Sequence, residues 1–247
     1  MVRYVVLGFT AGRSSIEIIG RYKTEGELRD VFEGGPRLAL RASRRGLYIF
    51  RECGPGEGDC LYIITFDIRS VEVRDPRRAR SPSRVRVPSH EYSEIREALL
   101  SKICGSVDLS TYVCFDNYAN EVDRYLRGVR ASYRVAYYRV RPWRDEDRDL
   151  VREAIQDTLG WIAARALELA SKVANVAPQG YGQVRKKAVL FLEELGAVKE
   201  LAKRVEAKLR ELGVELQVLQ AVVDSERMVR EAIQRREELR ARGRPQT

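Results

Sequence analysis

The first residues of this chain that could do chemistry are two closely spaced cysteines. Cys53 and Cys60 bracket the segment CGPGEGDC, between the apolar runs LYIFRE and LYIITF. Zinc sites place paired cysteines about two to four residues apart, so this wider spacing and the single histidine, His90, argue against zinc. The glycines indicate a hairpin turn across which the two thiols face each other at disulfide distance. A Cys53–Cys60 disulfide and a pair of free thiols both remain open, and no metal or cofactor is expected.

Carboxylates offer a weaker catalytic hypothesis. Asp116, Glu121 and Asp123 follow a predicted strand, the place where nucleases hold metal-binding carboxylates. Asp116 or Asn117 is well placed to cap the helix predicted after it, and no second carboxylate motif of matching quality is present, so capping is the favoured role. We therefore expect a protein that is not an enzyme, with a metal-dependent nuclease as the minor alternative.

An arginine-rich segment follows the predicted strands. RSVEVRDPRRARSPSRVRVP, residues 69–88, holds seven Arg against Glu72 and Asp75. Arg is a planar, bidentate donor to phosphate, and phosphate contacts make binding strongly salt dependent. The candidate nucleic-acid contacts here are Arg74, Arg77, Arg78, Arg80, Arg84 and Arg86. The alternative is a solvated loop without a partner.

A second segment, SYRVAYYRVRPWR at residues 132–144, interleaves arginines with aromatic residues. Aromatic faces stack on bases while guanidinium groups hold phosphates, a combination that favours single-stranded nucleic acid. The candidate contacts are Arg134, Tyr137, Tyr138, Arg139, Arg141, Trp143 and Arg144. The alternative is an ordinary strand with tyrosines on its core face and arginines on the other.

The elements that must position these residues change in type along the chain. Over residues 1–142, short β-branched and aromatic runs bounded by Gly, Pro and Asp predict an antiparallel, β-rich α+β domain. Over residues 143–242 the apolar period becomes 3.6, which predicts a long-helix bundle or coiled-coil domain. Residues 243–247 are expected to form a disordered tail.

The second predicted helix has the most regular apolar pattern in the chain. Its apolar residues step by four and three, the spacing of a coiled-coil seam. The seam comprises Val184, Ala188, Phe191, Leu195, Val198, Val205, Leu209 and Leu212. We expect these residues to support a homo-oligomer, although the pattern leaves open whether the seam packs within one chain or between chains.

Composition bounds the environment of the protein. The net charge is +9, and charged residues make up 33% of the chain, while Asn, Met and His are scarce. This bias is typical of hyperthermophile proteins, so we expect a heat-adapted, archaeal source in which cytoplasmic disulfides occur. The N-terminus does not have the pattern of a signal peptide, and no uncharged apolar run is long enough to span a membrane. A soluble, cytoplasmic protein is expected.

Three successive segments, LALRASRRGLYIF, LYIITFDIRSVEV and EYSEIREALLSKI, fall within residues 38–104. Their order resembles the small PH-like barrels of the GRAM and bacterial-PH type. The matching residues are Arg44, Arg45 and Gly46 at a turn, Ile68, Ser70, Val71 and Val73 on a strand, and Ile95 to Ile103 on a closing helix. The resemblance implies a partly open barrel that binds lipid headgroups, peptides or proteins, and the fold alone does not decide which.

Both arginine-rich segments favour nucleic acid as the partner. The function expected is therefore a non-catalytic, Arg-rich nucleic-acid-binding protein that self-associates through its helical domain. The leading alternative is a PH-like adaptor that binds a protein partner or an anionic lipid surface.

Overall fold

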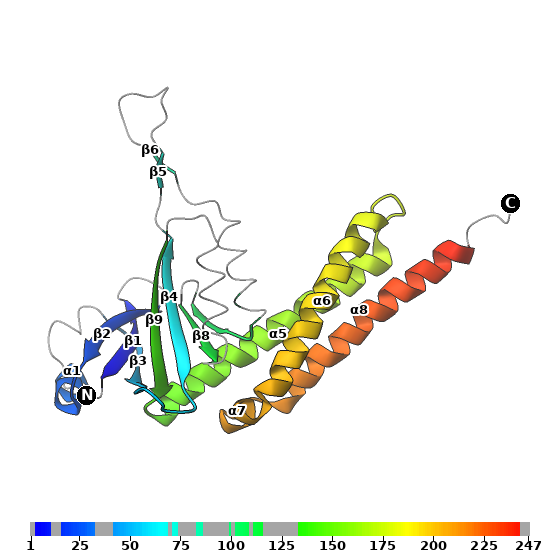
Figure 1. Ribbon diagram of the computed structural model, residues 1–247. Helices are drawn as coiled ribbons and strands as arrows, with labels where there is room; N and C mark the ends of the chain where they lie inside the picture. The colour runs from blue at the N-terminus through cyan, green and yellow to red at the C-terminus, as the bar shows by residue number, and fades with distance from the viewer. Residues whose placement is uncertain are drawn as a thin grey trace. The chain divides into compact units, whose positions relative to one another are not determined.

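The computed structural model describes residues 3–10, 16–32, 42–68, 71–73, 83–85, 99, 102–108, 111–115 and 133–242. Only the backbone is described at residues 9–10, 16–19, 29–32, 42–46, 66–68, 71–73, 83–85, 108 and 133–135. The α+β class expected from the sequence is confirmed, because an antiparallel sheet precedes a set of long helices (Figure 1).

Two compact units make up the chain, Met1–Ala154 and Ile155–Thr247. They divide within helix α5 (Asp145–Asn175), whereas the sequence placed the boundary just before this helix. Around Ala154 and Ile155 the helical pattern continues without a Pro- or Gly-rich linker, which is the feature by which a boundary is recognised in a sequence.

A seven-stranded sheet organises the first unit, with its strands in the order β2-β1-β3-β9-β4-β8-β7. Every neighbouring pair is antiparallel. The strands are β1 (Tyr4–Thr10), β2 (Ile16–Tyr22), β3 (Ala42–Glu52), β4 (Leu61–Ile68), β7 (Gly105–Asp108), β8 (Thr111–Phe115) and β9 (Tyr133–Pro142). Strand β9, the last along the chain, therefore lies between β3 and β4 and joins the two halves of the sheet.

The position of β9 shows that the hairpin predicted at Cys53–Cys60 is wrong. Strands β3 and β4 do not pair with each other. Instead Glu52 of β3 and Leu61 of β4 both pair with Val140, one on each side of β9. Residues 53–60 are therefore a crossover from one side of β9 to the other, and we call them the crossover segment. Local pattern predicts that a strand forms but not which strand it will pair with.

Helix α1 (Glu25–Phe32) packs on the β2-β1-β3 half of the sheet. Its N-terminus is capped by Thr24, whose Oγ1 accepts a hydrogen bond from the backbone N–H of Glu27 at 3.2 Å. Leu28 then reaches the small buried cluster of Tyr4, Val6, Leu28 and Ile49. The cap and this apolar contact together fix the helix on the sheet.

Two further strands form a separate two-stranded ribbon and are not hydrogen-bonded to the seven-stranded sheet. It consists of β5 (Val71–Val73) and β6 (Ser83–Val85), in which Val73 pairs with Ser83. The sequence predicts a strand at β5, but it predicts a loop up to Arg84 and a strand only from Val85, so β6 begins two residues earlier than expected. Their pairing holds the two ends of residues 74–82 next to each other.

The second unit contains the helices α6 (Tyr181–Arg204), α7 (Glu206–Glu211) and α8 (Leu216–Arg242), together with α5 from Ile155 onward. The predicted second helix is interrupted at Val205, which has φ −104° and ψ 8°, rather than weakened at Gly196. Gly213, with φ 79°, follows α7 in the left-handed region that favours glycine. Among the described residues, no helix combines the length and apolarity needed to cross a membrane.

The seam of the second predicted helix packs within a single chain. Ala188, Phe191, Leu195, Val198, Val205 and Leu209 are buried, and Val184 and Leu212 are half-buried. Ion pairs join α6 to α8 beside the seam, Arg185 with Glu237 at 2.6 Å and Lys199 with Glu226 at 3.2 Å. The regular spacing therefore reflects packing between helices of one bundle.

Candidate functional site

Strand β9 holds most of the predicted aromatic and arginine contacts, and its pleat divides them between two faces. Successive side chains of a strand alternate, so Tyr137, Arg139 and Arg141 point to one face and Tyr138 to the other. Tyr137 and Tyr138 are both half-buried. A nucleic-acid strand on one face of the sheet therefore cannot stack on both tyrosines. Of Arg134 only the backbone is described.

Three arginines on one face hold the crossover segment. Arg139 donates hydrogen bonds to the backbone carbonyl oxygens of Gly54, at 2.9 Å, and Glu57. Arg51 and Arg141 are paired across β3 and β9, and both form ion pairs with the carboxylate of Glu57, Arg51 at 2.7 Å. We call Arg51, Arg139 and Arg141 the arginine clamp. Because several of its donors bind the protein's own loop, its evident role is structural.

The opposite face of β9 is also engaged by the protein itself. Arg21 of β2 pairs with Glu52, and its guanidinium group lies 5.4 Å from the ring centroid of Tyr138. A cation over an aromatic face is attracted by the ring quadrupole. The ring of Tyr138 thus already has a cationic neighbour from its own chain.

Trp143 and Arg144, at the start of α5, have different environments. Trp143 is 43% exposed, and its ring packs edge to face on Tyr4 with centroids 5.1 Å apart. Arg144 donates hydrogen bonds to the carboxylate of Asp147 and to the backbone carbonyl oxygen of Leu47, at 2.6 Å. The hydrogen bond to Asp147 raises the pKa of Arg144. Of these two predicted contacts, Trp143 is exposed, whereas Arg144 binds partners within the chain.

Asp147 is a residue that the sequence analysis missed. Its side chain is 0% exposed, yet its carboxylate accepts hydrogen bonds from the backbone N–H groups of Ile49, at 2.7 Å, and Arg144, at 2.8 Å. Asp147 therefore caps α5 and ties the helix start to β3. The sequence does contain a signal for this role, because the first turn of α5 has three acidic residues and acidic groups stabilise helix N-termini.

The arginines of residues 74–86 cannot be placed in the same detail. Arg74, Arg77, Arg78, Arg80 and Arg86 lie outside the described residues, as do the carboxylates Asp116, Glu121 and Asp123. The backbone of Arg84 is described on β6, where Arg84 pairs with Glu72. Four of the candidate arginines belong to the connection whose ends are brought together by β5 and β6.

Cys53 and Cys60 form a disulfide, which confirms one of the two alternatives left open by the sequence. Their Cα atoms are 6.5 Å apart. The two sulfur atoms and a carboxylate oxygen of Glu57 all lie within 4.8 Å of one another. The pair meets across the crossover segment rather than across a hairpin.

A second disulfide, between Cys104 and Cys114, was not predicted. Strands β7 and β8 pair so that Gly105 lies opposite Val113, and the same register places Cys104 opposite Cys114. The Cα atoms of the two cysteines are 4.3 Å apart, close to the short spacing of antiparallel pairs. The disulfide was not predicted because a helix was expected up to Gly105 and no strand was expected at residues 106–108, so no strand pairing was available to align the thiols.

Reduction of both disulfides is expected to destabilise the first unit selectively. Each closes a short loop, and the chain-entropy model assigns such a loop about 2.5 kcal/mol at 25 °C. Denaturant unfolding with and without a phosphine reductant measures the change. Trp143 and Trp161 lie in different units, so W161F and W143F variants report on the two units separately. An equal loss in the second unit, which contains no cysteine, would contradict this assignment.

The helical unit contains an apolar groove of about 370 Å³. Its apolar lining includes Leu159 of α5, Val198 and Ala202 of α6, and Leu219 and Val223 of α8. Residues spaced by three and four along α6 and α8 thus present neighbouring stripes on one side of the groove. Such paired stripes are the surface on which a further amphipathic helix packs.

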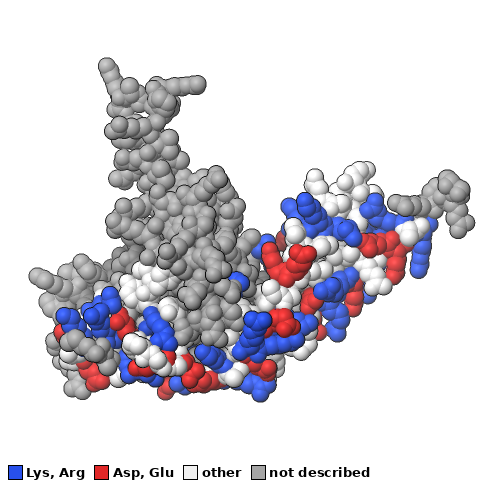
Figure 2. All heavy atoms as spheres, in the orientation of Figure 1, with Lys and Arg blue, Asp and Glu red and all other residues white. Residues whose placement is uncertain are grey.

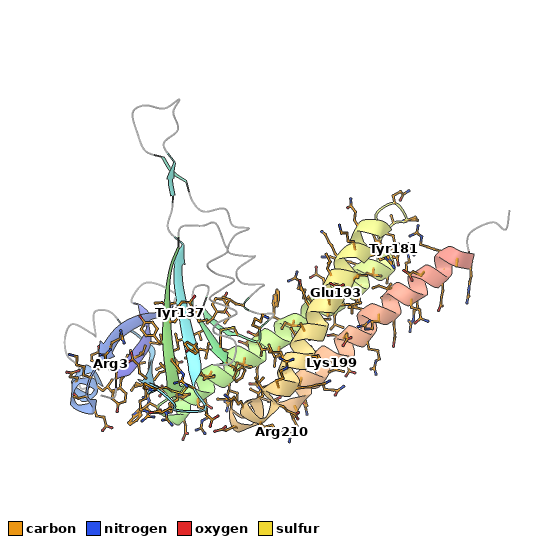
Figure 3. All side chains as sticks on the ribbon, in the orientation of Figure 1. Arg3, Tyr137, Tyr181, Glu193, Lys199 and Arg210 are labelled. Carbon is orange, nitrogen blue, oxygen red and sulfur yellow. A yellow bond between two sulfur atoms is a disulfide. The ribbon has the colours of Figure 1, made fainter. Side chains whose placement is uncertain are left out.

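Cations border this groove. Lys199, Lys203 and Arg210 line it beside a single acidic residue, Glu206, and Figure 3 labels Lys199 and Arg210 on the helices. Lys199 also pairs with Glu226 of α8. Burial alone would raise the pKa of Glu226, but hydrogen bonds from Arg230 and Lys199 leave the pKa lowered. The lining thus has three cations and one carboxylate, and each cation also has a carboxylate partner within the chain, Lys203 with Glu200 at 2.8 Å and Arg210 with Glu206 at 2.6 Å.

No protein-family model, curated protein or solved structure matches this chain. The resemblance to PH-like barrels therefore stays a prediction.

Proposed function

We propose that the protein is a non-catalytic, Arg-rich nucleic-acid-binding protein whose phosphate contacts lie in residues 74–86. The observation that supports this proposal is the pairing of β5 with β6. It places Val73 and Ser83, the residues that flank an arginine-rich connection, opposite each other.

The charge of this segment is the second argument. Residues 74–86 contain six Arg and one Asp, which gives a net charge of +5 within thirteen residues. A polyanion that binds such a segment releases its condensed counterions, so affinity falls steeply with salt. The face of the helical unit shown in Figure 2 has no comparable cluster of positive charge, because its Lys and Arg side chains are interspersed with Asp and Glu.

The contribution expected from β9 is smaller than the sequence suggested. The arginine clamp and Arg144 bind partners within the chain, and the two tyrosines point to opposite faces. Among the described rings of this segment, Trp143 is exposed, whereas Tyr137 and Tyr138 are half-buried. The preference for single strands consequently depends on Trp143 more than on Tyr137 and Tyr138.

Fluorescence anisotropy with labelled single- and double-stranded DNA and RNA tests the proposal. We expect the logarithm of the association constant to fall linearly with the logarithm of salt concentration, with a slope of about −4 for single strands or −5 for duplex DNA if six phosphates are contacted. The absence of binding at low salt would reject the nucleic-acid function.

A second function, that of an adaptor for a protein partner, is supported by the groove of the helical unit. Its apolar stripes and its excess of cations are complementary to an acidic amphipathic helix. Leu216, at 51% exposed, lines the groove and is available to such a partner.

A pair of leucine variants on α8 tests the adaptor function. L216E places a charge in the groove and should weaken binding of a labelled acidic amphipathic peptide by about tenfold or more, the effect of losing an apolar anchor. L239E is the matched control, because Leu239 is also exposed, at 59%, but does not line the groove. Equal affinities for the two variants would exclude this groove as the docking surface.

Self-association stays a prediction of the sequence. Six of the eight seam residues are buried within one chain, so these six can contact a second copy only if helices exchange between copies.

A further inference from the structure

The crossover segment gathers two sulfur atoms and a carboxylate at one place in the first unit. We propose that, once the Cys53–Cys60 disulfide is reduced, the two thiolates and Glu57 bind a thiophilic divalent cation of the Zn²⁺ class. The three donor atoms already lie within 4.8 Å of one another. Cysteine sulfur and carboxylate oxygen are both established zinc ligands. The site is redox-gated, because the disulfide and the metal compete for the same sulfur atoms.

The donors are held together by contacts that do not involve sulfur. Strands β3 and β4 anchor the two ends of the crossover segment beside Val140. Arg139 binds the carbonyl oxygens of Gly54 and Glu57, and Gly56, with φ 81°, makes the turn between them. Reduction of the disulfide breaks none of these contacts. The thiols therefore stay close after the bond between them opens.

The geometric change needed for metal binding is small. Two Zn–S bonds of about 2.3 Å at a tetrahedral angle place the sulfur atoms about 3.8 Å apart. The Cα atoms of Cys53 and Cys60 are 6.5 Å apart, a separation that two thiolates bound to one cation can span. Side-chain rotation at half-buried Cys53 can set this sulfur spacing while the backbone of buried Cys60 stays in place.

The charges of the surroundings suit an anionic metal complex. Two thiolates, one carboxylate and one Zn²⁺ carry a total charge of −1. The arginine clamp adds three positive charges around the same segment. Nearby cations favour the thiolate form of cysteine, which is the form that binds metal. The fourth coordination position is left for water or an external thiol.

Metal binding at this site requires reduction of the disulfide first. A dithiol or phosphine reductant transfers two electrons to the disulfide and is itself oxidised, while Cys53 and Cys60 each take up one proton. The cation then replaces the two thiol protons, which pass to solvent, so metal affinity rises with pH until both thiols are ionised.

The inference is tested by titrating reduced, full-length protein with Co²⁺ under anaerobic conditions. Tetrahedral Co²⁺ with thiolate ligands gives visible d–d bands and a near-ultraviolet charge-transfer band, which Zn²⁺ should bleach on displacement. We expect one cation per chain in reduced protein and none in oxidised protein. The thermal midpoint of the reduced protein should rise with Zn²⁺, because a ligand that binds the native state stabilises it.

Matched variants assign the signal to these residues. The second cysteine pair provides the control, since C104A/C114A should keep the cobalt spectrum after reduction and C53A/C60A should lose it. E57Q leaves both cysteines in place and should weaken metal binding by about tenfold or more. A spectrum that survives in C53A/C60A, or that is missing from reduced and folded C104A/C114A, would overturn the proposal. Circular dichroism establishes that each variant is folded.

Discussion

Replacement of Arg77, Arg78 and Arg80 by Gln is expected to lower the affinity for nucleic acid by about two to three orders of magnitude at about 0.1 M salt. The three side chains are the densest cationic cluster in the connection between β5 and β6. Each phosphate contact contributes about one unit to the salt slope, so the slope should fall by about 3. Anisotropy over a salt series measures both quantities on the same samples.

The control for this triple variant must remove the same charge elsewhere. K186Q/R204Q/R242Q does so on exposed helical positions of the second unit. Its affinity should stay within a few-fold of the unaltered protein, because long-range effects between exposed charges are screened beyond about 10 Å. If the two triple variants lose affinity equally, net charge rather than residues 74–86 governs binding, and the assigned contact surface is wrong.

The substitution D147A is expected to lower the free energy of unfolding of the first unit by about 3 kcal/mol. It leaves the buried N–H of Ile49 without an acceptor, a cost of about 1–3 kcal/mol, and removes the cap of α5, a cost of about 1 kcal/mol. The partner guanidinium of Arg144 is also left without its carboxylate. Denaturant unfolding followed by Trp143 fluorescence in a W161F background measures the change.

Two further variants separate the hydrogen bonds of Asp147 from a general effect of acidic residues on α5. D145A removes an exposed carboxylate from the same helical turn and should cost less than about 1 kcal/mol. D147N keeps the shape of the side chain but offers one oxygen acceptor instead of two, so its loss should be intermediate. A loss for D145A as large as that for D147A would show that helix-dipole charge, not the buried contacts, is responsible.

Much of the fold is local in origin and could be predicted. Alternating β-branched and aromatic residues predicted β1, β2, β4, β8 and β9, and period 3.6 predicted α5 and α8 to within a few residues. These patterns work because the core face of each element must be apolar whatever it packs against.

The candidate site was predictable only in part. The Cys53–Cys60 disulfide was one of two alternatives that the sequence left open, and the hairpin proposed for it does not exist. The arginines of β9 were read as ligands for phosphate, since their residue type alone does not show that Glu57 and two carbonyl oxygens already bind them. The charge of a residue in a sequence shows which groups it can bind, but it does not show whether a group of the same chain already binds it.

The sequence by itself determined the α+β class, the change from strands to helices and the positive charge of residues 74–86, because each depends on residue type and near neighbours. The tertiary structure alone decided that β9 enters the sheet between β3 and β4, that Cys104 faces Cys114, and that the seam of α6 packs inside one chain. These outcomes depend on contacts between residues far apart in the chain. Such contacts are selected by the burial and hydrogen bonding of the whole unit, which no short segment encodes.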